Sequence, residues 1–144
     1  TLTEWLSVLP TERISALASI AKNSSKTKNV DGDVTYKLLA HCTEKTALPK
    51  TESQWQNLFE LLGMRLDIVP VGCCGMAGTY GHEVEQLENS KGIYDLSWSQ
   101  PVKMAIDNKN EILATGYSCR SQVKRFDNER PRHPIEAIYD VLIK

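Results

Sequence analysis

The sequence predicts an α/β domain, in which a small parallel sheet of about three or more strands has helices on both faces, preceded by an N-terminal helical segment. Three short runs, at residues 34–42, 65–74 and 111–119, are rich in apolar and β-forming side chains and are typical of strands. Helical patterns separate these runs. Because parallel strands need a long crossover between them, this alternation indicates a parallel sheet with right-handed crossovers.

The amino-terminal part of the chain is predicted to lie outside this domain. Residues 1–23 carry apolar side chains at helical spacing, with Pro10 at a joint and Thr11 as a helix cap. The polar stretch NSSKTKNVDGD follows and indicates a loop. We therefore expect a helical lead-in and loop from a preceding domain at 1–30, and a cysteine-rich α/β domain at 31–144. The chain is expected to be a piece of a longer protein, because its first helix lacks a start signal.

An amphipathic helix is predicted between the first two strands, at residues 51–63. Thr51 and Gln54 fit a capping box, and Gly63 can end the helix. Four large apolar side chains share one face of this helix: Trp55, Leu58, Phe59 and Leu62.

Further helices are predicted along the rest of the chain, at about 79–90, 93–107, 119–126 and 133–144. Pro101 and Pro134 suit the first turns of two of them. Pro70 interrupts the second predicted strand, so we expect it at a sheet edge or bulge, where no ladder donor is needed.

The composition offers no electrostatic basis for a nucleic-acid or membrane partner. Seventeen Lys and Arg residues against eighteen Asp and Glu residues leave a formal net charge of -1. No apolar run approaches the roughly 18 residues of a transmembrane segment, and we expect no signal peptide. The expected location is the cytoplasm, with reduced thiols, and peripheral attachment to the inner face of the membrane is left open.

All four cysteines fall at the carboxyl ends of predicted strands. Cys42 follows the first strand, Cys73 and Cys74 the second, and Cys119 the third. Since parallel strands end at one edge, where open α/β sheets bind ligands, three distant segments would deliver thiols to one place. We interpret the thiols as a metal-binding or functional cluster, with burial as small core residues as the alternative. A disulfide is a third interpretation, with Cys42–Cys73 or Cys42–Cys119 geometrically better than a bridge between adjacent cysteines.

The glycines around the cysteine pair favour a ligand-binding turn. The stretch GCCGMAGTYG contains Gly72, Gly75, Gly78 and Gly81. Glycines let the backbone turn tightly and approach a ligand closely, although an ordinary strand-to-helix turn is the alternative. A helix that begins after the turn would favour the thiolate form of both cysteines.

The histidines and a basic segment are secondary candidates. His41 is expected to be a hydrogen-bonded packing residue, because it points away from Cys42 along an extended strand. His82 is a candidate ligand or site wall, and His133 is expected to cap the last helix. The basic segment is interpreted as a solvated face or a docking surface for an acidic partner, and comprises Lys124, Arg125, Arg130 and Arg132. No catalytic residue is predicted.

The segments AHCTEK, VGCCGMAGTYGHE, TGYSCRSQ and RPRHPIEAIYDVL together resemble the cysteine-rich CCG domain of heterodisulfide-reductase-like and glycolate-oxidase-like iron–sulfur subunits. The resemblance runs from about Tyr36 to the carboxyl end. It is closest to the carboxyl-terminal segment of bacterial FAD-linked oxidases, several of which act as D-2-hydroxyglutarate dehydrogenases. Those proteins fuse a flavin domain, a ferredoxin-type iron–sulfur domain and a CCG domain.

The family pattern is one cysteine, then CCG, then CxxC, and five cysteines hold an iron–sulfur cluster in the relatives. Gly75 matches the glycine of CCG, and Gln122 stands where the last cysteine is expected. The resemblance thus implies an iron–sulfur cluster of the 4Fe–4S class, with His82 or Gln122 as an additional ligand. The cysteines that match are Cys42, Cys73, Cys74 and Cys119.

The resemblance implies a redox domain that passes electrons from flavin toward an unidentified acceptor during oxidation of a 2-hydroxy acid. FAD is expected in the full-length protein and not in this segment, because no flavin-binding pattern is present. The implied partners are the flavin and ferredoxin-type domains of the same polypeptide. Zinc is the alternative metal, since four-cysteine zinc sites are common. The alternative function is a non-catalytic docking or structural domain with free or zinc-bound cysteines.

Overall fold

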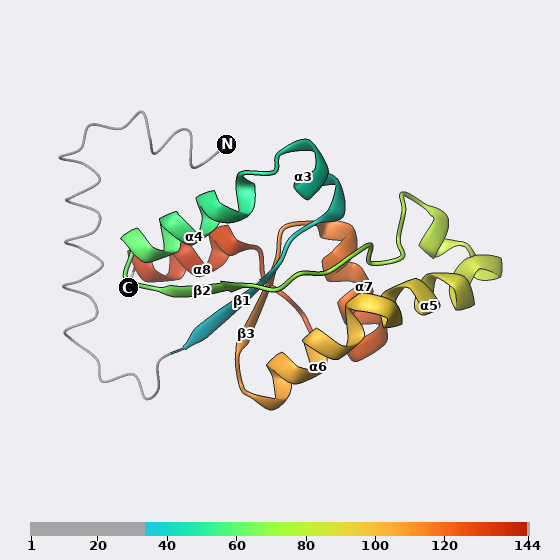
Figure 1. Cartoon of the computed structure of the whole chain (residues 1–144). Helices are drawn as coiled ribbons and strands as arrows, with labels where there is room; N and C mark the ends of the chain where they lie inside the picture. Colours follow the sequence, from blue (N-terminus) through green and yellow to red (C-terminus); the bar gives the residue numbers. More distant parts are fainter. Residues whose placement is uncertain (1–33, 144) are drawn as a thin grey trace.

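A three-stranded parallel sheet forms the centre of the structure, a computed structural model that describes residues 34–143 (Figure 1). Its strands are β1 (Thr35–Leu39), β2 (Arg65–Ile68) and β3 (Glu111–Ala114), in the order β2–β1–β3. The predicted α/β class with a parallel sheet is therefore confirmed. The helix predicted at 1–23, with the loop that follows it, lies outside the described residues.

The strand register brings the carboxyl ends of all three strands to one edge of the sheet. Leu38 of β1 pairs with Ile68 of β2, and Leu39 pairs with Ala114 of β3. Each of these residues lies at or next to the end of its strand. Every segment that follows a strand therefore leaves the sheet from the same edge.

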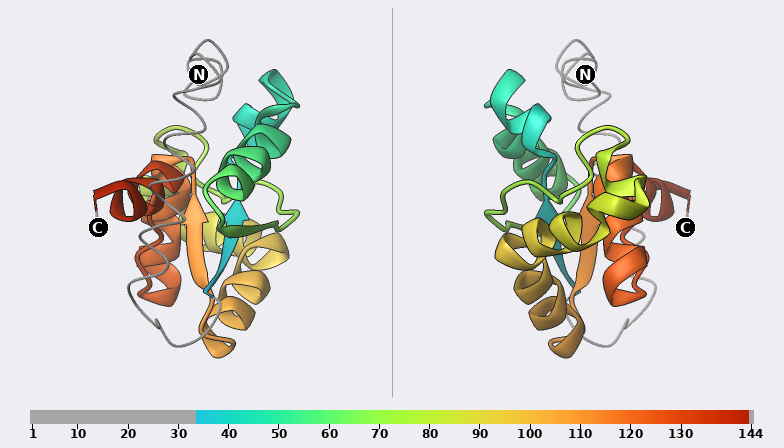
Figure 2. Two further views of the ribbon diagram at one scale, coloured as in Figure 1. Left: turned by 90° about the vertical axis from the view of Figure 1, so that its left-hand side faces the viewer. Right: turned by 90° about the vertical axis from the view of Figure 1, so that its right-hand side faces the viewer.

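Helices cover both faces of this sheet, as predicted (Figure 2). Leu38 packs in one core cluster with α4 and α8, and Leu39 packs in the other with α5, α6 and α7, because neighbouring strand residues face opposite sides. No helix between residues 34 and 143 is long and apolar enough to cross a membrane. The α-helices of this part are α3 (Cys42–Ala47), α4 (Thr51–Leu61), α5 (Leu87–Ser97), α6 (Ser99–Asp107), α7 (Tyr117–Asp127) and α8 (Pro134–Ile143).

The strands end earlier than the sequence pattern indicated. β1 ends at Leu39, because His41 caps α3 and the chain turns into that helix. β2 is an edge strand that ends at Ile68, so Pro70 lies outside the ladder, in agreement with the prediction for this proline. Val71 is buried although it pairs with no strand. The apolar pattern beyond the strand ends thus reflects burial of connecting segments.

The helix predicted at about 79–90 is wrong in its boundaries. Two short 3-10 helices, η1 (Tyr80–His82) and η2 (Val84–Gln86), precede α5, which begins at Leu87. Glu83 between them has an extended backbone, with φ −72° and ψ 132°. This residue interrupts helical hydrogen bonding, and the α-helix therefore starts at Leu87 and not near residue 79, as the sequence indicated.

The capping box predicted at the start of α4 is also wrong. Thr51 is the first helical residue and is buried, while Lys50 occupies the cap position without a side-chain hydrogen bond. The cause is a preceding turn closed by the hydrogen bond from Thr51 N to Leu48 O (2.9 Å), which places the threonine inside the protein. Two other local predictions are confirmed. Gly63 takes a φ of +72° just beyond α4, and His133 Nδ1 accepts a backbone hydrogen bond at the start of α8.

Replacing Asp67 with asparagine is expected to make stability less dependent on pH in the acid range. Lys37 Nζ donates to Asp67 Oδ2 (2.6 Å) across β1 and β2, and this hydrogen bond lowers the pKa of Asp67. The stabilisation is therefore present above the ordinary Asp pKa and is lost as the pH falls through the lowered value. Because the pair is partly exposed, Asp67→Asn should cost roughly 0.2–1 kcal/mol at neutral pH and nothing in strong acid. Urea denaturation at neutral pH and in strong acid measures the change in the free energy of unfolding, and Glu129→Gln is the control at an exposed position.

Candidate functional site

The four cysteines lie in the three segments that leave the carboxyl edge of the sheet. Cys42 is the first residue of α3, after β1, and Cys119 is the third residue of α7, after β3. Cys73 and Cys74 lie in the irregular segment that follows β2. The expectation that the cysteines are the last residues of strands is wrong, because each strand ends a few residues before its cysteine. Their common edge of the sheet is the one that the sequence indicated.

The segment that carries Cys73 and Cys74 is held in place by side chains of α5 and its neighbouring residue. Gly72 N donates to Ser97 Oγ (3.0 Å), and Trp98 Nε1 donates to Gly72 O (3.0 Å). Ser90 Oγ donates to Gly75 O (2.8 Å). These bonds satisfy the backbone polar groups of a segment that has no strand partner.

Gly75 is required at the turn itself. Its φ is +85°, a conformation that L side chains rarely adopt. A Cβ at this position would lie 2.2 Å from Ser90 O and 3.3 Å from Gln122 Nε2. The glycine therefore allows the turn to pack directly on the backbone of α5 and on the side chain of Gln122.

The thiols are brought together in two pairs. Cys74 and Cys119 are buried and hydrogen-bond each other, whereas Cys42 and Cys73 are partly exposed and also interact through a hydrogen bond. Electrostatic interactions connect the pairs, between Cys73 and Cys74 and between Cys42 and Cys119. All four cysteines are free thiols, with no disulfide. The buried pair thus forms the floor of the site and the other pair its more exposed side.

The two thiols of the buried pair have opposite pKa shifts. The hydrogen bond from Cys119 lowers the pKa of Cys74 to about 6, with further support from the backbone amide of Met76 and the hydroxyl of Ser118. The same hydrogen bond, together with burial, raises the pKa of Cys119. Burial also raises the pKa of Cys73. Among Cys73, Cys74 and Cys119, Cys74 is therefore the residue whose surroundings favour the thiolate form.

His41 is a hydrogen-bonded packing residue between α3 and α7. Its Nδ1 accepts from Thr43 N (3.0 Å), so its Nε2 carries the proton of a neutral ring and faces Ser118 Oγ (3.2 Å). The ring also packs over Gly116, where a Cβ would lie 2.2 Å from His41 Cδ2 and 3.0 Å from Cys119 Sγ. Both ring nitrogens are engaged, which leaves neither free as a ligand.

Gln122, at the position where the resemblance led us to expect a cysteine, connects the cysteine turn to α5. Its side chain is fully buried, and its Nε2 donates to Cys74 O (2.9 Å) and Ser90 Oγ (2.8 Å). Its Oε1 is buried and has no hydrogen-bond partner. Sequence reasoning identified this position, but it missed Ser90, Ser97 and Ser118, because isolated serines in helical stretches carry no distinguishing signal.

The remaining candidates do not join the thiols. His82 is exposed in η1. Arg132 of the basic segment forms ion pairs with Glu111 (2.5 Å) and Asp140 (2.6 Å), so its role is structural. Among residues 34–143, no group of three or more His, Cys, Asp or Glu side chains is arranged to hold one metal ion.

Gln122→Ala is expected to lower the free energy of unfolding by roughly 2–4 kcal/mol. The change removes two buried hydrogen bonds and leaves a cavity beneath the turn that carries Cys74. Urea denaturation of metal-free protein measures the loss. Gln56→Ala is the matched control, since Gln56 is exposed and makes only one long hydrogen bond, to Leu66 O (3.4 Å). Equal effects of the two changes would contradict a bracing role for Gln122.

The fold and site define a small α/β domain with four thiols at the carboxyl edge of a parallel sheet. Over 122 residues the chain is 49% identical to D-2-hydroxyglutarate dehydrogenase of Escherichia coli, covering 85% of this chain and 12% of that protein. It is 53% identical to the protein of the same name from Pantoea ananatis, over 73% of this chain and 10% of that protein. For the Haemophilus influenzae protein of that name the identity is 45%, over 84% of this chain and 11% of the relative.

The similarity therefore concerns one segment of much longer proteins. The chain spans only 10–12% of the length of these relatives. No family model and no solved structure matches the chain.

Proposed function

We propose that this chain is the cysteine-rich redox domain of an FAD-linked D-2-hydroxy acid dehydrogenase, in which an iron–sulfur cluster passes electrons from flavin toward an acceptor. The observation that carries the proposal is the delivery of four free thiols from three segments, each following a strand, to one edge of the sheet. The similarity to segments of proteins named D-2-hydroxyglutarate dehydrogenase supports the choice of reaction class. Oxidation of the hydroxy acid is assigned to a flavin domain elsewhere in the longer protein.

The donor set suits an iron–sulfur cluster better than a single ion. Thiolates are the usual ligands of such clusters, and their irons can be held by different sulfurs. Here the sulfurs lie in two pairs, and no three of them are arranged around one point. The buried, unpartnered Oε1 of Gln122 supplies one further acceptor at the position of the missing cysteine. A four-thiolate zinc site would instead require all the sulfurs to converge on one ion.

The residues of this chain would hold the cluster and tune its surroundings. The ligands would be Cys42, Cys73, Cys74 and Cys119. When bound, an iron–sulfur cluster supplies one-electron transfer. Gly75 N donates to Cys73 Sγ (3.4 Å), and hydrogen bonds of this kind stabilise negative charge on a ligating sulfur. The buried positions of Cys74 and Cys119 keep water away from one side of the site.

A second candidate function is a non-catalytic docking or structural domain with free or zinc-bound cysteines. The observation that favours its free-cysteine form is the lack of a group of three ligands around one point within residues 34–143. In this case the hydrogen-bonded thiol pairs would act as part of the core.

Elemental analysis with visible absorbance distinguishes the two functions. Protein prepared without oxygen is expected to contain iron and sulfide in similar amounts and to absorb in the visible range. Zinc in place of iron, or colourless protein that takes up no iron and sulfide during reconstitution, would contradict the redox proposal and support the structural one. Anaerobic preparation is needed because Cys42 and Cys73 are partly exposed and would leave a bound cluster open to oxygen.

A further inference from the structure

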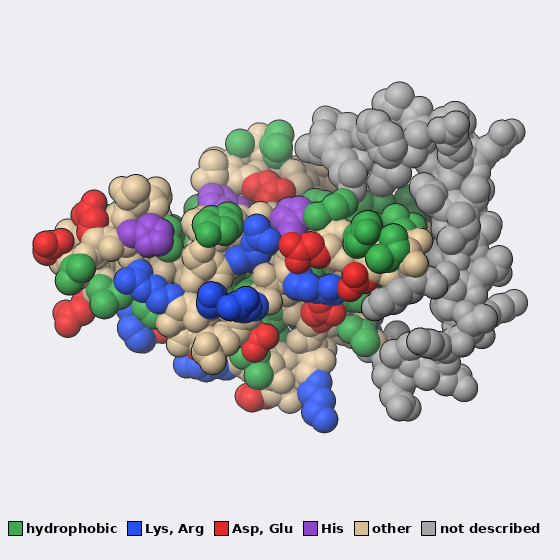
Figure 3. Space-filling view, turned by 180° about the vertical axis from the view of Figure 1, so that it is seen from behind, with side chains coloured by type: hydrophobic (Ala, Val, Ile, Leu, Met, Phe, Trp, Pro, Cys, Tyr) green, Lys and Arg blue, Asp and Glu red, His purple; other side chains and the backbone are tan. Residues whose placement is uncertain are grey.

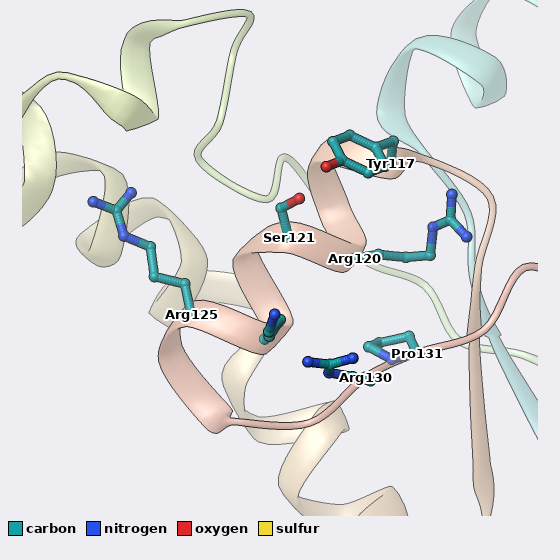
Figure 4. Close-up of a pocket in the computed structure, with 7 residues that line it drawn as sticks. Tyr117, Arg120, Ser121, Arg125, Arg130 and Pro131 are labelled. Carbon is teal, nitrogen blue, oxygen red and sulfur yellow. The ribbon is translucent and has the colours of Figure 1, made fainter.

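A second concave site lies on the outer side of α7, between this helix and the segment that leads to α8. Its volume is about 600 Å³. Figure 4 shows Tyr117 and Ser121 of α7 on one side of the hollow and Arg130 and Pro131 of the following segment on the other. Lys and Arg side chains gather on the face of the molecule seen in Figure 3. No cysteine lines the site, and Cys119 of the same helix is buried in the core.

The lining of this pocket is strongly cationic. Four of its side chains are basic, from Arg120, Lys124, Arg125 and Arg130, and no acidic side chain lines it. Arg120 has one ion pair, at 3.6 Å from Glu136, and Arg125 donates to Gly81 O. Within residues 34–143, Lys124 and Arg130 form no ion pair and no side-chain hydrogen bond. Two positive charges beside a hollow are thus left without a counter-charge.

The polar groups around these charges include one buried donor that lacks an acceptor. Arg120 Nε is buried and has no hydrogen-bond partner. The hydroxyls of Tyr117 and Ser121 also line the pocket, and the guanidinium of Arg120 lies over the Tyr117 ring at 5.9 Å. An unpaired buried donor is costly, and an oxyanion is the acceptor that suits a guanidinium best.

We propose that this pocket binds a small molecule that carries carboxylate or phosphate groups. Lys124 and Arg130 would supply the unpaired charges, Arg120 Nε an unused donor, and the two hydroxyls further hydrogen bonds. One charged hydrogen bond contributes little in so open a site, so two oxyanion groups would be needed for useful affinity. The inference is independent of the cluster, because none of these residues is a proposed cluster ligand.

Calorimetric titration of the chain at low ionic strength tests the proposal, with citrate and inorganic pyrophosphate as separate probes. We expect at least one probe to bind, and the combined Lys124→Gln and Arg130→Gln changes to weaken its binding by about tenfold or more. Lys50→Gln is the matched control, since Lys50 is exposed at the start of α4 and should leave binding unchanged. Both changed side chains are exposed, so thermal unfolding should stay close to that of the original protein.

The comparison of probes assigns the ligand class. Binding of citrate alone indicates a carboxylate ligand, and binding of pyrophosphate alone indicates a phosphate ligand. The proposal is overturned if neither probe binds, or if the double variant binds as tightly as the original protein. Binding of a polyglutamate peptide without binding of either small probe would also overturn it, and would assign the surface to an acidic protein partner.

Discussion

Replacing Gly75 with alanine is expected to lower the free energy of unfolding by roughly 2–5 kcal/mol. A side chain at a φ of +85° costs about 1–2 kcal/mol. The new Cβ would also lie 2.2 Å from Ser90 O, and a backbone atom of α5 cannot move aside as a flexible side chain can. Such overpacking typically costs about 1–3 kcal/mol. Urea denaturation of metal-free protein measures the loss.

Alanine substitutions at two other glycines separate the cost of the positive φ from the cost of the close contact with α5. Gly78 has a φ of +68° with nothing within 4 Å of its added Cβ, so Gly78→Ala should cost only about 1–2 kcal/mol. Gly92 lies inside α5 with open space around it, so Gly92→Ala should be neutral or stabilising by up to about 1 kcal/mol. If Gly75→Ala proved no more costly than Gly78→Ala, the close packing of the turn on α5 would be wrong.

Cys74→Ser in the full-length dehydrogenase proposed above is expected to lower turnover with an electron acceptor by at least about 100-fold. Loss of groups that only support a ligand typically costs 10–100-fold, and Cys74 would be a ligand itself. Reduction of the flavin by the hydroxy acid should be unchanged, because that step is assigned to another domain. Single-turnover flavin reduction and steady-state turnover measure the two steps separately.

Ser118→Ala is the control for this change. Its hydroxyl lowers the pKa of Cys74 and Cys119 but supplies no thiolate, so the variant should retain its iron. Cys74→Ser should lose most of the iron while the fold persists. Full turnover by a folded Cys74→Ser protein would argue against electron transfer through this site and for the structural function.

Much of the fold could be predicted from the sequence, because its causes are local. The apolar face of α4, with Trp55 and Phe59, and the prolines at helix starts depend on residues that are close in the chain. The strand order could not be predicted, because it depends on which distant segments pair. The boundaries were wrong for a related reason. Val71 is apolar because it is covered by other elements, and single-sequence patterns do not separate such burial from strand pairing.

The candidate site likewise has features that the sequence predicts and features that only the structure shows. Its cysteines and Gly75 stand out in the sequence because their chemistry and spacing are unusual. The division of the sulfurs into a buried and a more exposed pair depends on how α7 packs against the turn, which no local pattern records. The supporting hydrogen bonds of Ser90 and Gln122 join residues 15 and 48 positions away, so they became visible only in three dimensions.

The central position of β1 has a consequence for the order of assembly. Lys37 of β1 pairs with Asp67 of β2 on one side and with Ile112 of β3 on the other. β1 comes before both in the chain, so its second edge stays unpaired until β3 has been synthesised. Closing so long a loop is slow relative to the formation of helices. The thiol-bearing edge is complete only when α7 docks, so insertion of the proposed cluster would follow folding of this domain. In zinc fingers, by contrast, the metal itself drives the chain to fold.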